Sequence, residues 1–451
     1  MQFYLDGYRP GDPDVLPAAP GAEARYASLP DEVDVLVVGS GPAGTLLAAQ
    51  LSTFPDIHTR LVERRAGPLE LGRADGIACR TVEMFEAFGM GTRLIREAYW
   101  VNETVFWRPS PEDRNRIVRT GRIQDTEDGL SEFPHVIVNQ ARLQEYLLEY
   151  MRKSPSRMRP DYGVEFVGLA VEPGGERPVV VTLRRTDGGA EHVVRARYVV
   201  GCDGAHSRVR ESIGAAPHGD FANHVWGVMD VLAVTDFPDI RLKSAIQSAD
   251  HGNVLIIPRE GGYLVRLYVD LGDVDPEKRA AVREITADQA IAAAQRVLRP
   301  YTLDVRDVAW FSVYEVGQRV TDRFDDVRAG DAASRLPRVF IAGDACHTHS
   351  AKAGQGMNVS MQDAFNLGWK LVSVLEGRAG PGLLRTYSIE RRAIAQELID
   401  FDRRWSKTMS SPPKDPAHPE RGGVDPAELQ AQFMQSGRYT AGVATRYGPT
   451  T

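Results

Sequence analysis

The chain is 451 residues long and carries 54 Lys and Arg against 61 Asp and Glu, which gives a formal net charge of −7. This balance argues against a general nucleic-acid-binding protein, because such a protein needs a basic face to neutralise phosphates. A hydrophobic content of 43% and a charged content of 25% are typical of globular proteins and argue against a disordered or fibrous chain. At about 150 residues per domain, the length allows two or three domains.

The cysteines are Cys79, Cys202 and Cys346, an odd number at wide spacing, which favours neither a disulfide framework nor a paired metal site. Cys346 lies close to His347 and His349, and such a tract can ligate zinc, but no second ligand pair stands nearby. We therefore expect no metal. The amino terminus lacks the apolar core of a secretion signal, and no apolar run approaches membrane-spanning length. These observations predict a cytoplasmic protein without a membrane partner.

The predicted elements begin with an arm over residues 1–32, which is rich in Pro, Gly and Ala and is expected to lie on the surface of the body. Residues 33–39 form an apolar, β-branched run that is typical of a buried parallel strand. A helix over 44–51 and a strand over 59–63 complete a β-α-β unit. Further predictions are a helix from 139, a strand over 195–204, strands between about 221 and 320 with a helix at 287–297, and a strand over 336–345.

Two predictions concern the last part of the chain. A helix is expected over 361–375, with Met361, Phe365, Trp369 and Val372 on one side, because these residues recur at helical spacing. After Ser410 the sequence is rich in Pro and Gly, which is typical of a linker.

A glycine-rich motif follows the first predicted strand. Gly39, Gly41 and Gly44 form G-x-G-x-x-G between that strand and a helix, and Glu63 ends the next strand. Glycines permit a tight turn and the close approach of a pyrophosphate, the helix N-terminus faces the phosphates, and Glu63 can accept a hydrogen bond from a ribose hydroxyl. An ordinary glycine-rich turn is the alternative, and the strand-turn-helix context disfavours it.

Two motifs far downstream bear on which dinucleotide binds. Asp203 lies in GCDGAHSRVR and Asp344 in GDACHTHSAKAGQGMN, each at the end of a predicted strand. An Asp in that place can accept a hydrogen bond from a ribityl hydroxyl. Gly354 and Gly356 open a helix whose amide end can stabilise negative charge on a reduced flavin.

Together the three motifs resemble those of the FAD-dependent aromatic hydroxylases of the p-hydroxybenzoate hydroxylase fold. The stretches FPHVIVNQARL, NVLIIPREGGYLVRLYVDL and SVYEVGQR are similar to the phenol hydroxylase branch, and within it to the 3-hydroxybenzoate 4-monooxygenases. The resemblance implies an α/β fold with a Rossmann-like FAD-binding domain over 33–215 and 321–411, a substrate-binding domain built on a mixed sheet over 216–320, and a linker segment over 412–451. Relatives continue into a thioredoxin-like domain, which we expect to be absent because the sequence ends at Thr451.

The resemblance also implies the chemistry. NADPH reduces FAD, the reduced flavin and O2 form a C4a-hydroperoxide, and a phenol is hydroxylated ortho to its hydroxyl, with 3-hydroxybenzoate giving 3,4-dihydroxybenzoate. A phenol 2-monooxygenase and a flavin-binding protein without hydroxylase activity are the alternatives, and a homodimer is compatible with the resemblance. The chain shows no second nucleotide-binding motif for NADPH, and Arg73 is the predicted contact for it. Further predicted cofactor residues are Gln140, Gly356, Met357 and Asn358.

Asp75 and Tyr268 are the predicted catalytic residues. Asp75, in GRADGIACRT, matches the family's catalytic aspartate, which draws on the phenolic proton and makes the ring electron-rich. An Asp-Gly turn is the alternative for this residue. Tyr268 lies two residues after Arg266, so both side chains share a face of the sheet, and the resemblance assigns the tyrosine to the substrate hydroxyl. A tyrosine that only packs across strands is the alternative there.

Lys243 bears on the identity of the substrate. The resemblance places this lysine beside the substrate carboxylate, and a chain of net charge −7 needs a local cation to hold an anion. An edge-strand lysine that prevents aggregation is the alternative. Tyr314 and His135 match further substrate-pocket positions, and each could equally be a core residue with its hydrogen bonds satisfied.

Overall fold

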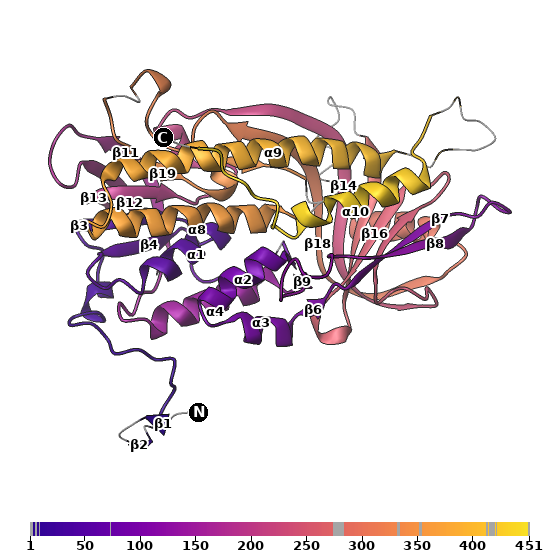
Figure 1. The fold of residues 1–451 in the computed structure, drawn as a ribbon, viewed down its shortest axis with the longest axis horizontal. Coiled ribbons are helices and arrows are strands. Elements are labelled where there is room, and N and C mark those ends of the chain that lie inside the picture. Colours follow the sequence, from indigo (N-terminus) through magenta and orange to yellow (C-terminus); the bar gives the residue numbers. More distant parts are fainter. Residues whose placement is uncertain are drawn as a thin grey trace.

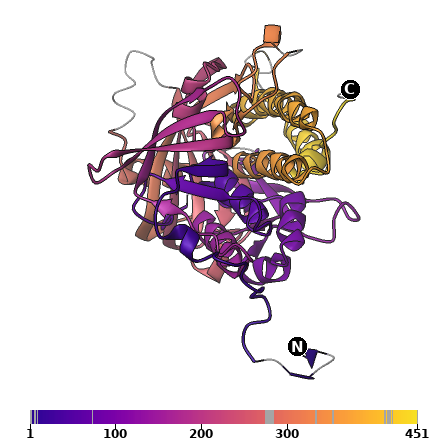
Figure 2. The same cartoon turned by 90° about the vertical axis from the view of Figure 1, so that its left-hand side faces the viewer.

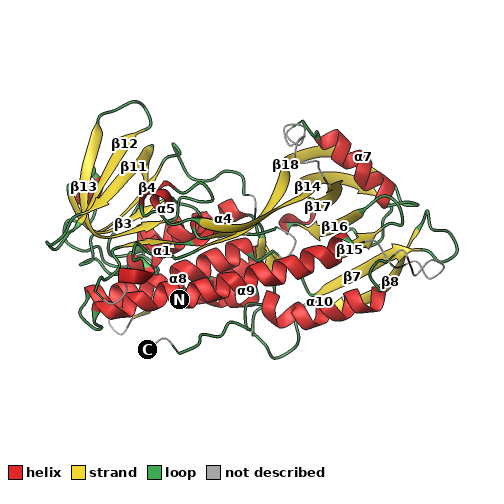
Figure 3. Cartoon of the chain, turned by 90° about the horizontal axis from the view of Figure 1, so that it is seen from above, coloured by secondary structure: helices red, strands yellow, loops and turns green. Residues whose placement is uncertain are grey.

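The computed structural model of the chain describes residues 3–4, 7–8, 10–72, 74–273, 284–331, 334–350, 354–411, 414, 420 and 422–449. Within this part of the chain, a seven-stranded and an eight-stranded sheet lie toward opposite ends of the molecule. The helix α8 (Gly356–Leu375) lies on the side of the first sheet, and the longer helix α9 (Arg385–Ser410) runs beside it and on to the second sheet (Figure 1; Figure 3). The predicted α/β class is confirmed.

The seven-stranded sheet, here the first sheet, has the order β10-β4-β3-β13-β12-β11, with β19 paired to β13. Its central strand β3 is parallel to β4 and β13, and every residue from Val33 to Val38 is buried. A strand covered on both faces needs apolar residues at successive positions, which explains the run Val35–Val38; Asp34, near the start of the strand, is buried with its carboxylate bonded to His58 N at 2.9 Å. The bounds are β3 (Glu32–Val38), β4 (Thr59–Glu63), β10 (Asp161–Tyr162), β11 (Val164–Val171), β12 (Val179–Arg185), β13 (Glu191–Gly201) and β19 (Val339–Ile341).

Helices cover the first sheet and complete the predicted β-α-β unit. Helix α1 (Pro42–Leu51) connects β3 to β4, and α4 (Gln140–Lys153) and α8 pack beside it. Asn139 caps α4, since its side chain accepts a hydrogen bond from the amide of Ala141 at 2.8 Å. Figure 2 shows these helices gathered against the strands, with α9 beside α8.

The eight-stranded sheet, here the second sheet, has the order β20-β18-β14-β17-β16-β15-β7-β8. Successive side chains in its strands point to opposite faces. Val105, Ile246 and Leu267 form one apolar face, which α7 (Ala287–Val297) covers. The bounds are β7 (Glu103–Pro109), β8 (Ile117–Gln124), β14 (Pro217–Thr235), β15 (Lys243–Gln247), β16 (Asn253–Pro258), β17 (Val265–Asp273), β18 (Leu303–Thr321) and β20 (His347–Thr348).

The opposite face of the second sheet carries a smaller aromatic core, here the aromatic face. It is formed by Phe106, Trp226, Val228, Ala245, Leu255 and Tyr268. Strands β7 and β8 contribute to this sheet although they lie within 33–215, outside the range 216–320 expected for the substrate-binding domain. The domain limits themselves stay a prediction.

Short elements lie between the two sheets. They are β5 (Gly76–Ile77), β6 (Tyr99–Trp100) and β9 (Val136–Ile137), which form a small sheet, and the helices α2 (Cys79–Ala87) and α3 (Gly91–Glu97). The short helix α5 (Arg208–Ser212) packs against β11 and β13 of the first sheet. In the described residues, no helix has the length and apolar character needed to cross a membrane.

The predicted arm lies only partly on the body. Leu16 and Ala19 donate backbone hydrogen bonds to Lys153 and Pro155 at 3.0 and 2.9 Å, and Tyr26 is buried. The strands β1 (Phe3–Tyr4) and β2 (Gly7–Tyr8) form a hairpin that projects away from the body (Figure 2).

The four residues predicted to share one side of α8 are not equally buried, since Met361 and Val372 are in the core. Trp369 is 44% exposed, whereas Leu367 and Leu371 are buried. The cause is the close approach of α1, because an ideal Cβ on Gly368 would lie 2.0 Å from Gln50 Oε1. This contact turns the side of α8 that carries Gly368 toward α1.

The predicted linker after Ser410 contains a helix, α10 (Pro426–Thr440). Phe433 on this helix packs edge-on against Phe106 with ring centroids 4.9 Å apart, and also against Trp405 of α9 at 4.4 Å. The linker prediction is therefore wrong for this stretch. Its Pro and Gly residues precede a run rich in good helix formers, and an aromatic contact across the sheet fixes that run in place.

Candidate active site

The turn between β3 and α1 has room only for glycine at two of the three motif positions. Gly39 has φ +98°, and an ideal Cβ on it would lie 2.6 Å from the carbonyl oxygen of Cys202. A Cβ on Gly44 would lie 1.9 Å from the carbonyl oxygen of Gly39. A Cβ on Gly41 meets nothing within 4 Å, so open space lies in front of the turn. The N-terminus of α1 has no side-chain cap, which leaves its amide end suited to an anionic group.

Glu63 stands at the end of β4, as predicted, and contacts the glycine turn. Its Oε2 accepts hydrogen bonds from Ser40 N at 2.8 Å and Ser40 Oγ at 2.9 Å, and its Oε1 accepts one from Arg65 N at 2.9 Å. Burial raises the pKa of Glu63, but the hydrogen bonds from Arg65 and Ser40 outweigh it and hold that pKa below its usual range. A carboxylate that stays ionised here suits a ribose hydroxyl donor.

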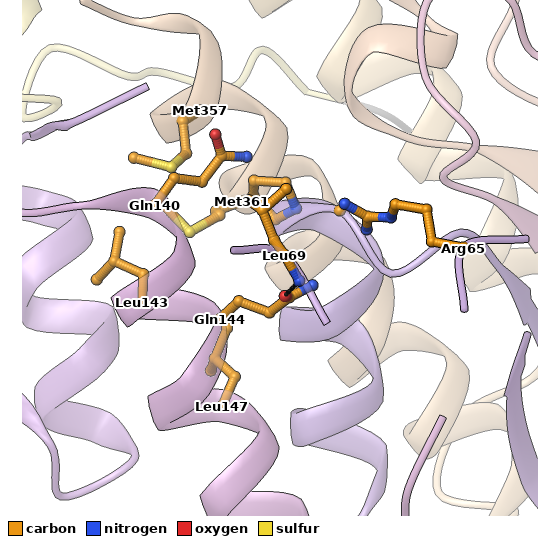
Figure 4. Close-up of a pocket in the computed structure, with 10 residues that line it drawn as sticks. Arg65, Leu69, Gln140, Leu143, Gln144, Leu147, Met357 and Met361 are labelled. Atoms are coloured by element: carbon orange, nitrogen blue, oxygen red, sulfur yellow. Dashed lines mark hydrogen bonds between the residues drawn. The ribbon is translucent and has the colours of Figure 1, made fainter. Parts of the chain in front are cut away.

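A cavity of about 370 Å³ begins at this turn and reaches the start of α8 (Figure 4). In Figure 4, Gln140 and Met357 lie at one end of the cavity and Arg65 at the other. Gln140 is also tied to the loop that precedes Asp75, because its Oε1 accepts a hydrogen bond from Ala74 N at 3.2 Å. The lining residues are Gly41, Pro42, Arg65, Leu69, Gln140, Leu143, Gln144, Leu147, Met357 and Met361.

The start of α8 forms the second end of the predicted cofactor site. Gly356 and Met357 begin the helix, whose N-cap residue Gln355 makes no side-chain cap hydrogen bond, so the amide end suits a second electron-rich group. Asn358 has another task. Its Nδ2 donates to Gly76 O at 3.0 Å, and its Oδ1 accepts from Ala78 N at 2.9 Å. The side chain therefore joins the start of α8 to the segment that carries Asp75.

Asp203 and Asp344 both follow strands of the first sheet, at the same edge as the glycine turn. Asp344 is exposed there. The carboxylate of Asp203 accepts hydrogen bonds from Arg208 N at 2.8 Å and Val209 N at 3.2 Å, so it caps α5. Its contact with a cofactor stays a prediction, and Arg73 lies outside the described residues.

The donor set fits a dinucleotide that carries a flavin. A glycine cradle with open space in front of it stands at an uncapped helix N-terminus, an ionised Glu63 lies beside it, and a second uncapped helix N-terminus closes the far end of the cavity. Within the described residues, no group of three His, Cys, Asp or Glu side chains could hold a metal ion. His347 instead lies with Nε2 2.8 Å from Asp363 Oδ2.

Asp75 lies in a buried cluster of charges between the cofactor site and the second sheet. Its Oδ2 is 2.8 Å from Arg259 Nη1 and 3.2 Å from Arg266 Nη1. Arg266 also donates from Nε and Nη2 to the two oxygens of Asp230, each at 2.7 Å, and Arg259 donates to Glu260 at 3.0 Å. Both arginines contact Oδ2 of Asp75, so the charge of this buried carboxylate is compensated from the side of the second sheet.

Tyr268 shares a face of β17 with Arg266, as predicted, and its side chain forms part of the aromatic face. Burial raises the pKa of Tyr268, and the negative charge of Asp75 raises it further, while Arg266 lowers it. The phenol therefore stays protonated and can donate a hydrogen bond. Tyr314 packs against the same face, with its ring centroid 6.3 Å from that of Trp310.

Lys243 and His135 meet at one carboxylate, Asp125. Lys243 Nζ lies 2.6 Å from Asp125 Oδ1, and His135 Nδ1 lies 2.8 Å from Asp125 Oδ2. Lys243 is not on an edge strand, because β15 pairs with both β16 and β7. The edge-strand alternative is thus wrong. In β15, Lys243 stands two residues from Ala245 and so points to the aromatic face, two strands or about 10 Å across the sheet from β17.

Sequence reasoning missed Arg259, Asp230 and Asp125. One signal for Asp230 was present, since a charged residue at an alternating position inside an apolar strand is rarely buried without a partner. Arg259 and Asp125 lie 184 and 118 positions from their partners Asp75 and Lys243, so no local pattern marks them.

Comparison with known proteins agrees with this geometry. A model of the FAD binding domain family matches residues 32–402. The chain is 59% identical to a 3-hydroxybenzoate 4-monooxygenase of Comamonas testosteroni over all of its length and 71% of that protein. It is 44% identical to an FAD-dependent monooxygenase of Aspergillus terreus (92% of this chain, 65% of that one). It is also 36% identical to a phenol 2-monooxygenase of Aspergillus fumigatus (93% and 66%).

Solved structures share the fold. An anhydrotetracycline hydroxylase of Streptomyces rimosus superposes with a TM-score of 0.67 at 26% identity, over 92% of this chain and 77% of that one. The flavin-dependent monooxygenase PieE, solved with FAD and substrate, gives a TM-score of 0.67 at 25% identity, over 92% and 72%. With the matched domain spanning both the glycine turn and the start of α8, the chain belongs to the FAD-dependent aromatic monooxygenases that share this FAD binding domain.

Proposed function

We propose that the chain hydroxylates 3-hydroxybenzoate at the carbon para to the carboxylate, giving 3,4-dihydroxybenzoate. The observation that carries the proposal is the layout of the aromatic face. Asp75 and Tyr268 form a site for a phenol, and Lys243 and His135 form a second site, here the cationic site. Lys243 lies on the same face as Tyr268, on a strand about 10 Å across the sheet and two residues along from Ala245, the residue in register with Tyr268. A benzene ring with a hydroxyl and a carboxylate in meta positions fits that separation. The 59% identity with the Comamonas testosteroni enzyme supports the same substrate.

The reaction consumes NADPH, a proton and O2, and yields NADP⁺ and water beside the dihydroxybenzoate. When FAD is bound, it supplies the activation of O2 and the transfer of one oxygen atom to the ring. The residues of the cofactor site that would hold it are the glycine turn, Glu63, Gln140 and the amide end of α8.

The chain's own residues prepare the ring. Oδ1 of Asp75 accepts a hydrogen bond from the phenol, which raises electron density at the ortho carbon. Tyr268, whose hydroxyl stays protonated, donates to the phenol oxygen and fixes its position. Arg259 and Arg266 keep the Asp75 side chain in place through Oδ2. The apolar residues Leu255 and Val228 of the aromatic face exclude water from the reacting ring.

One observation favours a second candidate, hydroxylation of an uncharged phenol. The charge of Lys243 is already compensated by Asp125, so the cationic site is not an open anion site in the absence of substrate. A neutral phenol would need only Asp75 and Tyr268.

The test measures NADPH oxidation by the FAD-loaded protein with 3-hydroxybenzoate, phenol and 4-hydroxybenzoate in parallel, together with product analysis and hydrogen peroxide. We expect 3,4-dihydroxybenzoate from the first compound with little peroxide. Catechol from phenol at equal or better kcat/KM would support the second candidate instead. Peroxide as the sole product with all three compounds would contradict both.

A pair of variants identifies the carboxylate site. Lys243→Met should raise KM for 3-hydroxybenzoate by about tenfold or more, because the cation next to the substrate is lost. Lys414→Met, at an exposed position outside both sheets, is the control and should leave KM unchanged. An unchanged KM in Lys243→Met would remove the carboxylate from the proposal. The preference for NADPH and the formation of a homodimer stay predictions, which parallel assays with NADH and light scattering would test.

A further inference from the structure

Asp125 holds together three elements at the cationic site. It directly follows β8, and its Oδ1 accepts hydrogen bonds from Lys243 Nζ of β15 and, at 3.2 Å, from Thr104 Oγ1 of β7. His135, which precedes β9, contacts Oδ2, and the backbone amide of Asp125 donates to Asn102 O at 2.9 Å. The side chains of Asp125, Lys243 and His135 are 8%, 17% and 22% exposed, so all three polar groups are largely removed from water.

The three side chains leave no net positive charge for a substrate. Lys243 contributes +1 and Asp125 contributes −1, and a neutral His135 adds nothing. Placing a second carboxylate beside Lys243 would then create an unbalanced negative charge in a poorly hydrated site, which is costly. A histidine is the side chain that takes up a proton most readily near neutral pH, and a protonated His135 would restore the balance.

The other titratable groups around His135 are engaged elsewhere. An ideal Cβ on Gly76 would lie 3.5 Å from His135 Nε2, so this nitrogen faces the segment of Asp75, whose charge is paired with Arg259 and Arg266. On α2, Cys79 lies with Sγ 3.7 Å from Thr126 Oγ1, and burial raises the pKa of its thiol.

One more ion pair stands near the site. On the side of α10, Glu127 is paired with Arg438 through two 3.0 Å contacts. These neighbours therefore offer no spare cation to an incoming carboxylate.

We propose that Asp125 couples the binding of a carboxylate-bearing phenol to the uptake of one proton by His135. The proton comes from solvent. The protonated ring then donates from Nδ1 to Asp125 and from Nε2 toward the substrate carboxylate. A neutral phenol brings no charge, so its binding takes up no proton. Asp125 is in this way a positioning residue that makes the affinity for acids depend on pH while the affinity for neutral phenols does not. The inference rests on the proposed function.

The experiment is titration calorimetry of the FAD-loaded protein at about pH 8, above the ordinary histidine pKa of about 6.5. 3-Hydroxybenzoate and the uncharged 3-hydroxybenzyl alcohol are titrated in phosphate and in Tris, which differ in heat of ionisation. The two ligands share the phenol, so proton transfer at that group cancels between them. For the acid we expect a buffer-dependent heat that corresponds to the uptake of up to one proton, and for the alcohol a heat independent of the buffer.

Three variants test whether His135 is the group that takes up the proton. Asp125→Asn keeps the shape and an acceptor for Lys243 but removes one negative charge. Proton uptake should vanish, and the Kd for 3-hydroxybenzoate at about pH 8 should fall by about tenfold, because the site gains a net positive charge. The Kd for the alcohol should not change. Glu127→Gln, in the same loop, is the matched control and should keep the wild-type uptake. His135→Gln should abolish the proton uptake. This variant replaces Asp125→Asn in the test if Asp125→Asn fails to bind FAD.

The outcomes separate this inference from the proposed function. Buffer-independent heats for 3-hydroxybenzoate in a protein that still forms 3,4-dihydroxybenzoate would overturn the inference alone. Uptake that persists in Asp125→Asn or His135→Gln would do the same. A wild-type protein that neither binds nor hydroxylates 3-hydroxybenzoate would overturn both.

Discussion

Asp75 has a structural and a chemical task, and the two can be separated because a second aspartate shares its counter-ions. Arg266 bridges Asp75 and Asp230, and the side chains of both aspartates are buried. Removing either carboxylate leaves a guanidinium partly uncompensated, which is destabilising in a buried site. In the function proposed above, only Asp75 accepts a hydrogen bond from the phenol.

This difference gives the first prediction. Asp75→Asn should lower kcat for ring hydroxylation by about 100-fold, because an amide is a much weaker acceptor for the phenolic proton. Asp230→Asn removes the same charge from the same arginines and should lower kcat far less. Product formed per NADPH consumed, at equal FAD content, is the measurement. Equal losses in the two variants would show that Asp75 acts only through the arginines.

Asp325 provides a prediction about pH. Burial raises the pKa of Asp325 to about 6, although its Oδ1 accepts a hydrogen bond from Val327 N at 2.8 Å. Since the folded state holds this proton more tightly than the unfolded state, the contribution of Asp325 to stability is greatest at low pH and is lost as pH rises from about 4 to about 6. The loss is about 3 kcal/mol.

Asp325→Asn should therefore raise the free energy of unfolding at neutral pH by up to that amount, and should have no effect below about pH 4. Urea unfolding at a series of pH values measures it. A gain that is independent of pH would mean that ionisation of Asp325 is not the cause.

At the residue scale, sequence alone identifies the groups that motifs mark. Asp75, Glu63 and the three glycines stand in fixed local patterns, and the structure places them around one cavity and its neighbouring cluster. Arg259 and Asp125 could not be identified from the sequence, because their roles arise from contacts between segments more than 100 positions apart. Such contacts depend on strand register in the second sheet, which no single stretch of sequence reveals.

At the scale of elements, the glycines in the turn between β3 and α1 have two different roles, one in the packing of the fold and one in the binding of the cofactor. Gly44 is needed for packing, since a Cβ there would meet the backbone of Gly39, whereas Gly41 borders open space. The two glycines of one motif therefore have different sensitivities to the same substitution.

Gly41→Ala should leave the thermal unfolding of the FAD-free protein unchanged but weaken FAD binding by about tenfold or more, because the added methyl enters the space where the pyrophosphate approaches. Fluorescence titration with FAD is the measurement. Gly382→Ala, which also meets nothing within 4 Å and lies in the turn of 3-10 helix at Pro381–Leu384, is the control. Normal FAD affinity in Gly41→Ala would show that the cofactor does not bind at this turn.

Elements with an unbroken or periodic pattern were predictable within a few residues. The strand at 59–63 and the helix at 287–297 are found with those bounds, because the apolar period of each matches its environment. The buried side of α8 and the helix α10 were not, since both depend on tertiary partners. Gly368 admits α1 closely, and Phe433 finds Phe106 on a distant strand.

At the scale of the whole molecule, Asp402 of α9 joins the second sheet to the loop that precedes α8. Its Oδ2 accepts hydrogen bonds from Gln318 Nε2 of β18 at 2.7 Å and from Ser350 N at 2.9 Å, and Ser350 Oγ contacts Oδ1. Ser350 lies in the loop between the glycine-rich edge of the first sheet and α8. One buried carboxylate thus links the second sheet, the cofactor loop and the long helix.

Asp402→Ala should lower the free energy of unfolding by about 3 kcal/mol or more, because buried donors lose a charged acceptor. Asp400→Ala, on the same helix with only Gln396 as a bonded neighbour at 3.1 Å, should change it by less than about 0.5 kcal/mol. Urea unfolding followed by circular dichroism compares them. A similar effect in both variants would assign the loss to helix propensity.

The interleaving of the chain between the two sheets has a consequence for protein engineering. The second sheet takes β7 and β8 from residues 103–124, most of its strands from 217–321, and β20 from 347–348. A chimera that exchanges only residues 216–320 with a relative would combine five strands of one parent with β7 and β8 of the other, and β7 pairs directly with β15. Thr104 and Asp125, which hold Lys243, would then belong to the other parent. To transfer the substrate range of one relative to another, a chimera should therefore take residues 103–125 and the middle segment from the same parent.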